Sequence, residues 1–410
     1  MILEEMFRRP LCDEDAIHRR VQTLEGFVRR AVDFPFESAD LDAAEIYLDA
    51  TDERTRLGAQ ATSTLRRLGN LIARDVQTKQ IHVGVTALLA LFNQMRTFMA
   101  GLDFPAQHPY QHVRSSVAAL MNVPAFDFAH GGKGGAPGRE AMEQLDGLLR
   151  FEHREEVRRL LSYIYELDAL LAVASVARSL GYAFPQVLPA GKLSVALEGL
   201  YHPLVKNAVA NSIGVTDEAN VLFLTGANMA GKSTFMKSLG LCLYLAHMGF
   251  PVPARSMTFS VLDGIYTTIN LPDDLGTGAS HFYAEVRRVK KVAEELARGR
   301  NIAVIFDELF RGTNVTDAGD ATVATVRGFA RKPQSLFVIS THVIEAGARL
   351  KQVCGNIRYI CLPTRMEDGQ PVYTYTLESG VSSDRHGMTI VRNAGILDIL
   401  ERGQRRTSSA

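Results

Sequence analysis

The sequence contains no long apolar run, and no stretch approaches the ~20 residues that a membrane-spanning helix requires. Its N-terminus, Met1-Ile-Leu-Glu-Glu-Met-Phe-Arg-Arg-Pro10, carries acidic side chains and lacks the apolar core of a secretory signal peptide. We therefore expect a cytoplasmic protein that does not have a membrane as a partner.

Cysteine is scarce as well, because only four cysteines occur among 410 residues: Cys12, Cys242, Cys354 and Cys361. Their spacing matches no metal-binding motif. Scattered cysteines are typical of proteins in the reducing cytosol, where disulfides are rare. The sequence thus predicts neither a disulfide nor a zinc site.

Net charge is also absent, since 45 lysines and arginines balance 45 aspartates and glutamates. The composition therefore does not indicate nucleic-acid binding, and any surface for DNA would have to be local. One candidate is the arginine-rich outer face of a helix expected at 57–76: Arg56, Arg66, Arg67 and Arg74. A solvated helix face is the simpler interpretation, and a nucleic-acid-facing patch is the alternative.

The length predicts two or three domains. Up to about residue 190, apolar residues recur at three- and four-residue steps, which predicts helices at 13–30, 57–76, 81–99 and from residue 139 to about Gly181. One buried stripe is Leu160, Ile164, Leu167, Leu171 and Ala174. The glycine-rich stretch 130–138 is interpreted as a loop or linker. We therefore expect a helical domain over 1–190.

Short apolar runs alternate with helical patterns after Pro189. The runs are 221–224, 302–306, 336–339, 357–362 and 372–377. This alternation predicts an α/β domain with a largely parallel sheet over 191–402. The remaining residues, 403–410, form a polar tail.

A glycine-rich loop, Gly226-Ala-Asn-Met-Ala-Gly-Lys-Ser233, joins the run 221–224 to a helix expected at 232–248. Glycines let the backbone turn sharply and direct its N–H groups at phosphate oxygens, and the helix N-terminus adds partial positive charge. Lys232 can reach the β- and γ-phosphates, and the Ser233 hydroxyl can ligate Mg²⁺. The alternative is a plain strand–turn–helix corner without a ligand.

The run 302–306 ends in two carboxylates, Asp307 and Glu308. Because ligands gather at the carboxyl ends of parallel strands, Asp307 is expected beside the glycine-rich loop, where it can hold Mg²⁺. Glu308 can accept a proton from, or orient, the water that attacks the γ-phosphate. The alternative is an acidic pair that merely closes a strand at the surface.

Two further polar residues are candidates. His342 follows the run 336–339 and can donate a hydrogen bond to the γ-phosphate, although a histidine there, taken alone, is an ordinary surface residue. Ser280 precedes a helix expected at 282–296. A serine at that place is ordinarily a cap, but it could also face a γ-phosphate bound to a second subunit. Spacing alone does not decide between these roles.

Taken together, these segments resemble the MutS family of DNA mismatch-repair ATPases, a branch of the ABC-type P-loop ATPases. Residues 225–234, Thr-Gly-Ala-Asn-Met-Ala-Gly-Lys-Ser-Thr, are close to the family's TGPNMGGKST. Further matches follow in the family's order: Pro251-Val-Pro-Ala254 with VPA, 273–282 with DDL…GxSTF, Asp307-Glu-Leu-Phe-Arg-Gly-Thr313 with DExGRGT, and Ser340-Thr-His342 with ATH. Tyr201-His-Pro-Leu204 is similar to RHPL, and His386-Gly387 is similar to YG. The resemblance covers about 197–400.

The resemblance is weaker upstream, where 10–20 and 167–185 look like the start and end of the family's helical lever domain. The stretch between them is shorter than a lever with a DNA clamp, and the Phe-x-Glu wedge of the mismatch-recognition domain is absent. We therefore expect a truncated form that lacks this domain. Inside the ATPase part, departures from the motifs are Ala227, Ala230, Thr268, Asn270 and His281.

The resemblance implies an ATP hydrolase that requires Mg²⁺, forms a homodimer through its ATPase domains and acts on DNA or with repair partner proteins. It implies that the ATP-binding residues are Gly226, Ala227, Asn228, Met229, Ala230, Gly231, Lys232, Ser233, Thr234 and, for the partner's ATP, Ser280. Mg²⁺ would be held by Ser233 and Asp307. The catalytic residues would be Glu308, His342 and Lys232, and Tyr373 or Tyr375 would lie near the adenine.

Two other functions are weighed against this one. The absent mismatch domain and the balanced charge are compatible with an ATP-gated assembly or scaffold protein that has no direct DNA contact. A small-molecule kinase is disfavoured, because an Asp-Glu pair suits the activation of water and no lid segment follows it.

Overall fold

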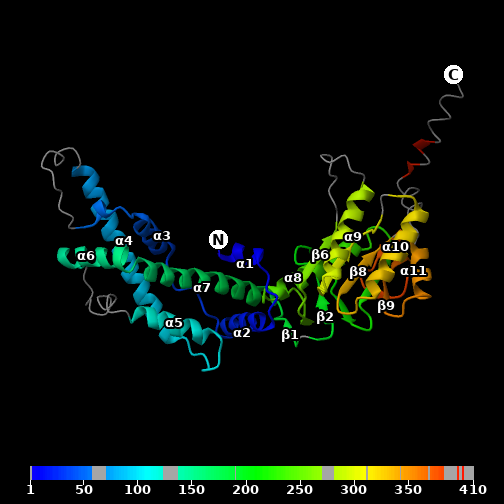
Figure 1. Ribbon diagram of the computed structural model, residues 1–410, viewed down its shortest axis with the longest axis horizontal. Helices are drawn as coiled ribbons and strands as arrows, with labels where there is room; N and C mark the ends of the chain where they lie inside the picture. The colour runs from blue at the N-terminus through cyan, green and yellow to red at the C-terminus, as the bar shows by residue number, and fades with distance from the viewer. Residues whose placement is uncertain are drawn as a thin grey trace, which may run out of the picture. The chain divides into compact units, whose positions relative to one another are not determined.

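The computed structural model describes residues 2–57, 71–122, 137–189, 191–269, 281–310, 313–341, 343–367, 370–382, 395–396 and 399–400. The chain forms two compact units (Figure 1). Met1–Arg8 and Gln22–Ser179 form the first unit, and Arg9–Val21 and Leu180–Ala410 form the second.

The first unit is helical, as the apolar periodicity predicts. Its elements are α1 (Ile2–Arg8), α2 (Glu14–Arg30, which begins in the second unit), α3 (Ser38–Asp49), a 3₁₀ turn η1 (Glu53–Thr55), α4 (Leu71–Gly101), α5 (Tyr110–Met121), α6 (Arg139–Asp146), a π-helical segment η4 (Gly147–Glu152) and α7 (Arg154–Leu180). The helix expected at 81–99 lies within α4. Of the helix expected at 57–76, residues 58–70 lie outside the described part, and so do Arg66, Arg67 and the Arg74 side chain. Most of the glycine-rich stretch, 130–136, lies outside it too.

Helix α7 forms because a stripe of apolar residues on one of its faces is buried. All five residues predicted for this stripe are buried: Leu160, Ile164, Leu167, Leu171 and Ala174. The helix ends where Gly181 takes a φ of 66°, a left-handed conformation that suits glycine. Among the described helices α7 is also long and apolar enough to cross a membrane, contrary to the sequence expectation, but half of its most apolar window is buried inside the protein. The core helix of a globular protein can have the same length and composition.

The second unit contains all the strands that the structure describes. They are β1 (Gln186–Leu188), β2 (Ser194–Leu200), β3 (Asn211–Thr216), β4 (Val221–Gly226), β5 (Ser256–Ser260), β6 (Gly264–Thr268), β7 (Ile302–Phe306), β8 (Leu336–Ser340), β9 (Ile357–Leu362), β10 (Thr364–Glu367), β11 (Gln370–Tyr373) and β12 (Glu378–Ser379). Its helices are α8 (Lys232–His247), α9 (His281–Ala297), α10 (Val315–Ala330) and α11 (Ile344–Lys351).

The central sheet has the strand order β12-β9-β4-β8-β7-β6, and all its pairings except that of β12 are parallel. Strands β4, β7 and β8 are apolar along their length because both faces of this sheet are covered. Val221 and Phe223 pack with α9, α10 and α11, whereas Leu222 and Leu224 pack with α8 and the second sheet, β1-β5-β2-β3. The predicted α/β fold with a largely parallel sheet is confirmed.

Two expectations differ from the structure. Residues 9–21, which the periodicity places with the helical domain, group with the α/β unit, because Ile17 and Val21 lie in the core shared by α8 and the second sheet. The strand expected at 372–377 is wrong after Tyr373. Strand β11 ends at Tyr373, and Tyr375 has a φ of 54°, which a strand does not allow.

Candidate functional site

The glycine-rich loop connects β4 to α8 in a tight reversal. Gly226 and Gly231 have φ values of 148° and 98°, which residues with a Cβ rarely adopt. A Cβ at Gly226 would also lie 2.9 Å from the carbonyl oxygen of Leu362. Met229, at the exposed tip, takes a φ of 69°. The two glycines of the motif are therefore required by this backbone path.

Lys232 is the first residue of α8, and its side chain is buried against the loop. Its ammonium group donates hydrogen bonds to the carbonyl oxygens of Gly226, at 2.8 Å, and Ala227, at 3.0 Å. Burial lowers the pKa of Lys232, while the negative charges of Glu308 and Asp307 act in the opposite direction. A partly desolvated cation thus lies on the inner side of the loop, close to two carboxylates.

Ser233 and Asp307, which are 74 positions apart in the sequence, are in direct contact. The Ser233 hydroxyl donates a hydrogen bond of 2.6 Å to Asp307 Oδ2. The other carboxylate oxygen, Oδ1, is buried and has no hydrogen-bond partner within the described part of the chain. The Ser233 hydroxyl and the Asp307 carboxylate, one of whose oxygens is unused, are ligands suited to a hard cation such as Mg²⁺.

No cluster of three or more histidine, cysteine, aspartate or glutamate side chains that could hold a metal occurs in the described ranges. A cation at Ser233 and Asp307 would therefore take most of its ligands from elsewhere. Mg²⁺ fits this arrangement, because it is commonly bound by one or two protein ligands together with phosphate oxygens and water.

The backbone after β7 turns in an unusual way. Glu308 and Phe310 have φ values of 56° and 62°, and such left-handed conformations cost about 1–2 kcal/mol each for residues other than glycine. The turn is anchored by the Leu309 N–H, which donates to the Ser340 carbonyl at 3.2 Å, and by burial of Leu309 and Phe310. This path leaves Glu308 at the wall of the same cavity that Lys232 and Ser233 line.

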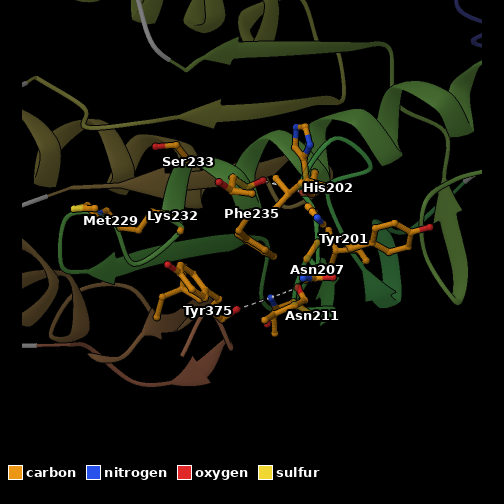
Figure 2. A pocket seen from close by; sticks show the side chains of 18 of the residues that line it. Tyr201, His202, Asn207, Asn211, Met229, Lys232, Ser233, Phe235 and Tyr375 are labelled. Atoms are coloured by element: carbon orange, nitrogen blue, oxygen red, sulfur yellow. Dashed lines mark hydrogen bonds between the residues drawn. The ribbon is translucent and has the colours of Figure 1, made fainter. Parts of the chain in front are cut away.

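The cavity has a volume of about 600 Å³, and Figure 2 shows side chains that line it. Such a volume is typical of small-molecule sites. Predicted residues that line it are Asn228, Met229, Gly231, Lys232, Ser233, Thr234, Glu308 and Tyr375. Tyr373 does not line it, and Gly226 and Ala227 instead accept the Lys232 hydrogen bonds. Ala230, within the loop, is buried, and both Ser280 and His342 lie outside the described residues.

One wall of the cavity consists of residues that motif spacing does not predict. They belong to the segment 200–211, and the polar ones are Tyr201, His202, Lys206, Asn207 and Asn211. Asn211 holds Tyr375 in place, since its amide donates to the Tyr375 carbonyl at 2.9 Å and accepts from the Leu377 N–H at 2.7 Å. The only signal for this wall in the sequence is the RHPL-like stretch that begins at Tyr201.

The fold and the site together define an α/β protein whose candidate site lies at the carboxyl edge of a parallel sheet, beside a glycine-rich loop. Residues 222–409 match the family model of MutS domain V. The match includes most of the loop strand β4, all of α8, and the Asp307–Glu308 pair. This part of the chain is similar to MutS domain V.

Proposed function

We propose that this protein is a Mg²⁺-dependent ATP hydrolase of MutS type. The observation that carries the proposal is the contact of 2.6 Å between the Ser233 hydroxyl and Asp307 beside the buried Lys232, in a cavity that Glu308 also lines. A plain structural corner would not need a cation, a hydroxyl and two carboxylates together at the edge of a cavity.

The residues divide the work of phosphate binding. Lys232 would exchange its two loop carbonyls for oxygens of the β- and γ-phosphates, and the backbone N–H groups from Asn228 to Thr234 would bind the remaining oxygens. Ser233 and Asp307 would hold Mg²⁺, and the unused Asp307 Oδ1 provides a place for it or for its water. Bound Mg²⁺ neutralises charge on the phosphates.

Glu308 is the proposed general base. It follows Asp307 directly and lines the cavity, so its carboxylate can orient a water molecule and take its proton as the water attacks. Tyr375, whose ring lies over Gly231, is the proposed contact for the adenine. His342 is proposed to donate to the γ-phosphate.

The test of hydrolysis is phosphate release from Mg·ATP by the wild-type protein and by Glu308→Gln. We expect the variant to bind ATP with unchanged affinity and to hydrolyse it at least ~10²-fold more slowly, because general-base catalysis is lost. A matched control is Glu378→Gln, an exposed glutamate on β12, which should keep the wild-type rate. Wild-type turnover by Glu308→Gln would refute the assignment.

Dimerisation through the ATPase domains is part of the proposal, with Ser280 directed at the ATP of the second subunit. The variant Ser280→Ala should bind ATP as a monomer and fail to form an ATP-dependent dimer in sedimentation velocity runs. Undiminished dimerisation would count against this role.

The last component of the proposal is that the protein acts on DNA or together with repair proteins. The second candidate function, an ATP-gated assembly protein without DNA contact, is favoured by the balanced charge of the chain. Binding of DNA whose affinity falls steeply with salt separates the two, because only phosphate contacts release counterions.

A further inference from the structure

Asn211 and Tyr375 lie side by side on one wall of the candidate site (Figure 2). Asn211 is the first residue of β3, a strand that pairs with β2 in the second sheet. Tyr375 belongs to the segment 374–377, which connects β11 to β12. The wall therefore joins a residue on a sheet strand to a residue in a connecting segment.

The side-chain amide of Asn211 is committed to backbone groups. Its nitrogen donates to the Tyr375 carbonyl at 2.9 Å and to the Val209 carbonyl at 3.3 Å, and its oxygen accepts from the Leu377 N–H at 2.7 Å. Because an amide nitrogen has two protons to donate, both are used on these carbonyls. Asn211 therefore acts on a molecule in the cavity through the backbone that it holds.

The backbone of Tyr375 requires such support. Its φ of 54° is a left-handed conformation, which residues other than glycine keep only where surrounding contacts enforce it. On one side, the Thr374 hydroxyl donates to the Pro363 carbonyl at 3.0 Å, and on the other the Leu377 side chain packs against the core. Tyr375 itself is 45% exposed, so packing contributes less there. Between the two anchors, Asn211 holds the carbonyl of Tyr375.

This backbone conformation places the Tyr375 ring against the glycine-rich loop. Ring atom Cδ1 lies 3.1 Å from the position that a Cβ would take on Gly231, and Cε1 lies 3.9 Å from it. Lys232 and Ser233, which follow Gly231, line the same cavity as Tyr375. An aromatic ring beside the place proposed for the phosphates is suited to stacking on a nucleobase.

We infer that Asn211 is a positioning residue for the nucleobase, because it holds the backbone of Tyr375 so that the ring forms the platform on which the base stacks. The inference rests on the proposed function, since it requires that the cavity binds a nucleoside triphosphate. The amide of Asn211 is not directed at the phosphates. Its loss should therefore weaken the part of the affinity that the base contributes and leave the part that the phosphates contribute.

The test compares two ligands, one with a nucleoside and one without. Isothermal titration calorimetry of the full chain with Mg²⁺ measures the affinity for a non-hydrolysable ATP analogue and for inorganic tripolyphosphate. Stacking on an aromatic side chain is worth about 10-fold in affinity or more, so Tyr375→Ala should bind the analogue about 10-fold more weakly. Asn211→Ala should show a loss of similar size, and both variants should bind tripolyphosphate with wild-type affinity.

The double variant Asn211→Ala, Tyr375→Ala separates positioning from an independent effect of Asn211. If Asn211 acts through the ring, its removal costs nothing further once the ring is absent, and the double variant should bind the analogue as Tyr375→Ala does. Additive losses would overturn the inference. Wild-type affinity of Asn211→Ala for the analogue would also overturn it, and so would an equal loss of affinity for tripolyphosphate.

Asn356→Ala is the matched control. The amide of Asn356 donates to the Ala330 carbonyl at 2.6 Å and to Asn220 Oδ1 at 2.7 Å, and this half-buried residue precedes β9 at the end of the sheet opposite to the loop. The variant should keep wild-type affinity for both ligands. Thermal melting checks that each variant is folded. If Asn211→Ala is not, Asn211→Asp replaces it, because aspartate keeps the acceptor for Leu377 and loses the donor to Tyr375.

Failure of this inference is distinguishable from failure of the proposed function. A wild-type protein that binds neither ligand would overturn the proposed function and this inference with it. A wild-type protein that binds both, together with unchanged binding of the analogue by Asn211→Ala, would leave the proposed function and remove only the role of Asn211.

Discussion

At the scale of single residues, the candidate site contains backbone conformations that residues other than glycine normally avoid. Met229, Glu308, Phe310 and Tyr375 all have φ between 54° and 69°. Such strain persists only where surrounding contacts enforce it, and it is common at functional sites. Phe310 is the clearest case, because it stands where the similar motif DExGRGT has its first glycine.

Two opposite contributions to stability meet at Phe310, the strain of its backbone and the packing of its ring, and substitutions can separate them. Removing the strain with glycine should gain about 1–2 kcal/mol, but losing a buried Phe side chain costs about 3–5 kcal/mol. Phe310 is 4% exposed, and its ring lies 5.9 Å from that of Phe282. Packing should therefore win, and Phe310→Gly should be less stable than wild type by about 2 kcal/mol in urea unfolding.

The matched variant is Phe310→Ala, which loses the same packing and keeps the strain. It should be less stable than Phe310→Gly by about 1 kcal/mol. Equal free energies of unfolding for Phe310→Ala and Phe310→Gly would show that residue 310 does not adopt the left-handed conformation in solution.

Motif spacing singles out the glycine-rich loop and the pair Asp307–Glu308, but neither the cavity wall formed by 200–211 nor the way the backbone presents these side chains. The pairing of Ser233 with Asp307 follows from two strands that end at one edge of a parallel sheet. The contact between Asn211 and Tyr375 does not, because it joins residues 164 positions apart that share no motif. A sequence pattern contains no information on such a contact or on the φ of Tyr375.

At the scale of elements, the sequence predicts the strands that are buried on both faces and does not predict the strands that are partly exposed. Continuous apolar runs predict β4, β7, β8 and β9 almost to the residue. Strands β2 and β3 alternate between buried and exposed positions, and β12 has only two residues. None of these three strands therefore contains a continuous apolar run. Periodicity predicts α8 and α9 well because each has one buried face.

The C-terminal end of α8 contains a buried histidine that should make stability depend on pH. His247 Nε2 accepts from the Leu262 N–H at 2.9 Å, so Nδ1, 2.7 Å from the Leu243 carbonyl, must carry the proton. Protonation of Nε2 would break the first bond. Burial lowers the pKa of His247 below its ordinary value of 6.5, so the folded state favours the neutral ring.

The contribution of His247 is therefore fully present above pH 6.5 and is lost as the pH falls through the lowered pKa of the folded state. Urea unfolding of wild type and of His247→Gln should show a smaller loss of stability on acidification in the variant. Parallel curves for wild type and His247→Gln would contradict the prediction.

At the scale of the whole molecule, each of the two units has its own interior, and that of the helical unit contains a buried ion pair. Asp146 accepts from Arg150 at 2.8 Å, from the Tyr47 hydroxyl at 2.9 Å and from the Leu57 N–H at 2.8 Å. Both members of the pair are almost fully buried, at 0% and 1% exposure. The pair ties the loop after α3 to the π-helical segment.

Removal of one charge should leave the other buried without compensation. Asp146→Asn should therefore cost about 3–5 kcal/mol in the free energy of unfolding. The exposed pair of Arg139 and Glu143, at 3.2 Å, provides the control, and Glu143→Gln should cost less than about 1 kcal/mol. Urea denaturation followed by circular dichroism measures both, and equal midpoints for the two variants would contradict the prediction.

The central claim is that the cavity between the glycine-rich loop and Glu308 holds a triphosphate with Mg²⁺. The most direct measurement is a crystal structure of the protein grown with magnesium and a non-hydrolysable ATP analogue. We predict that the phosphates lie against Lys232 and the loop N–H groups, with Mg²⁺ at Ser233 and Asp307 and the Glu308 carboxylate facing the terminal phosphate. An empty cavity at saturating analogue, or a Glu308 carboxylate turned away from a bound triphosphate, would contradict the claim.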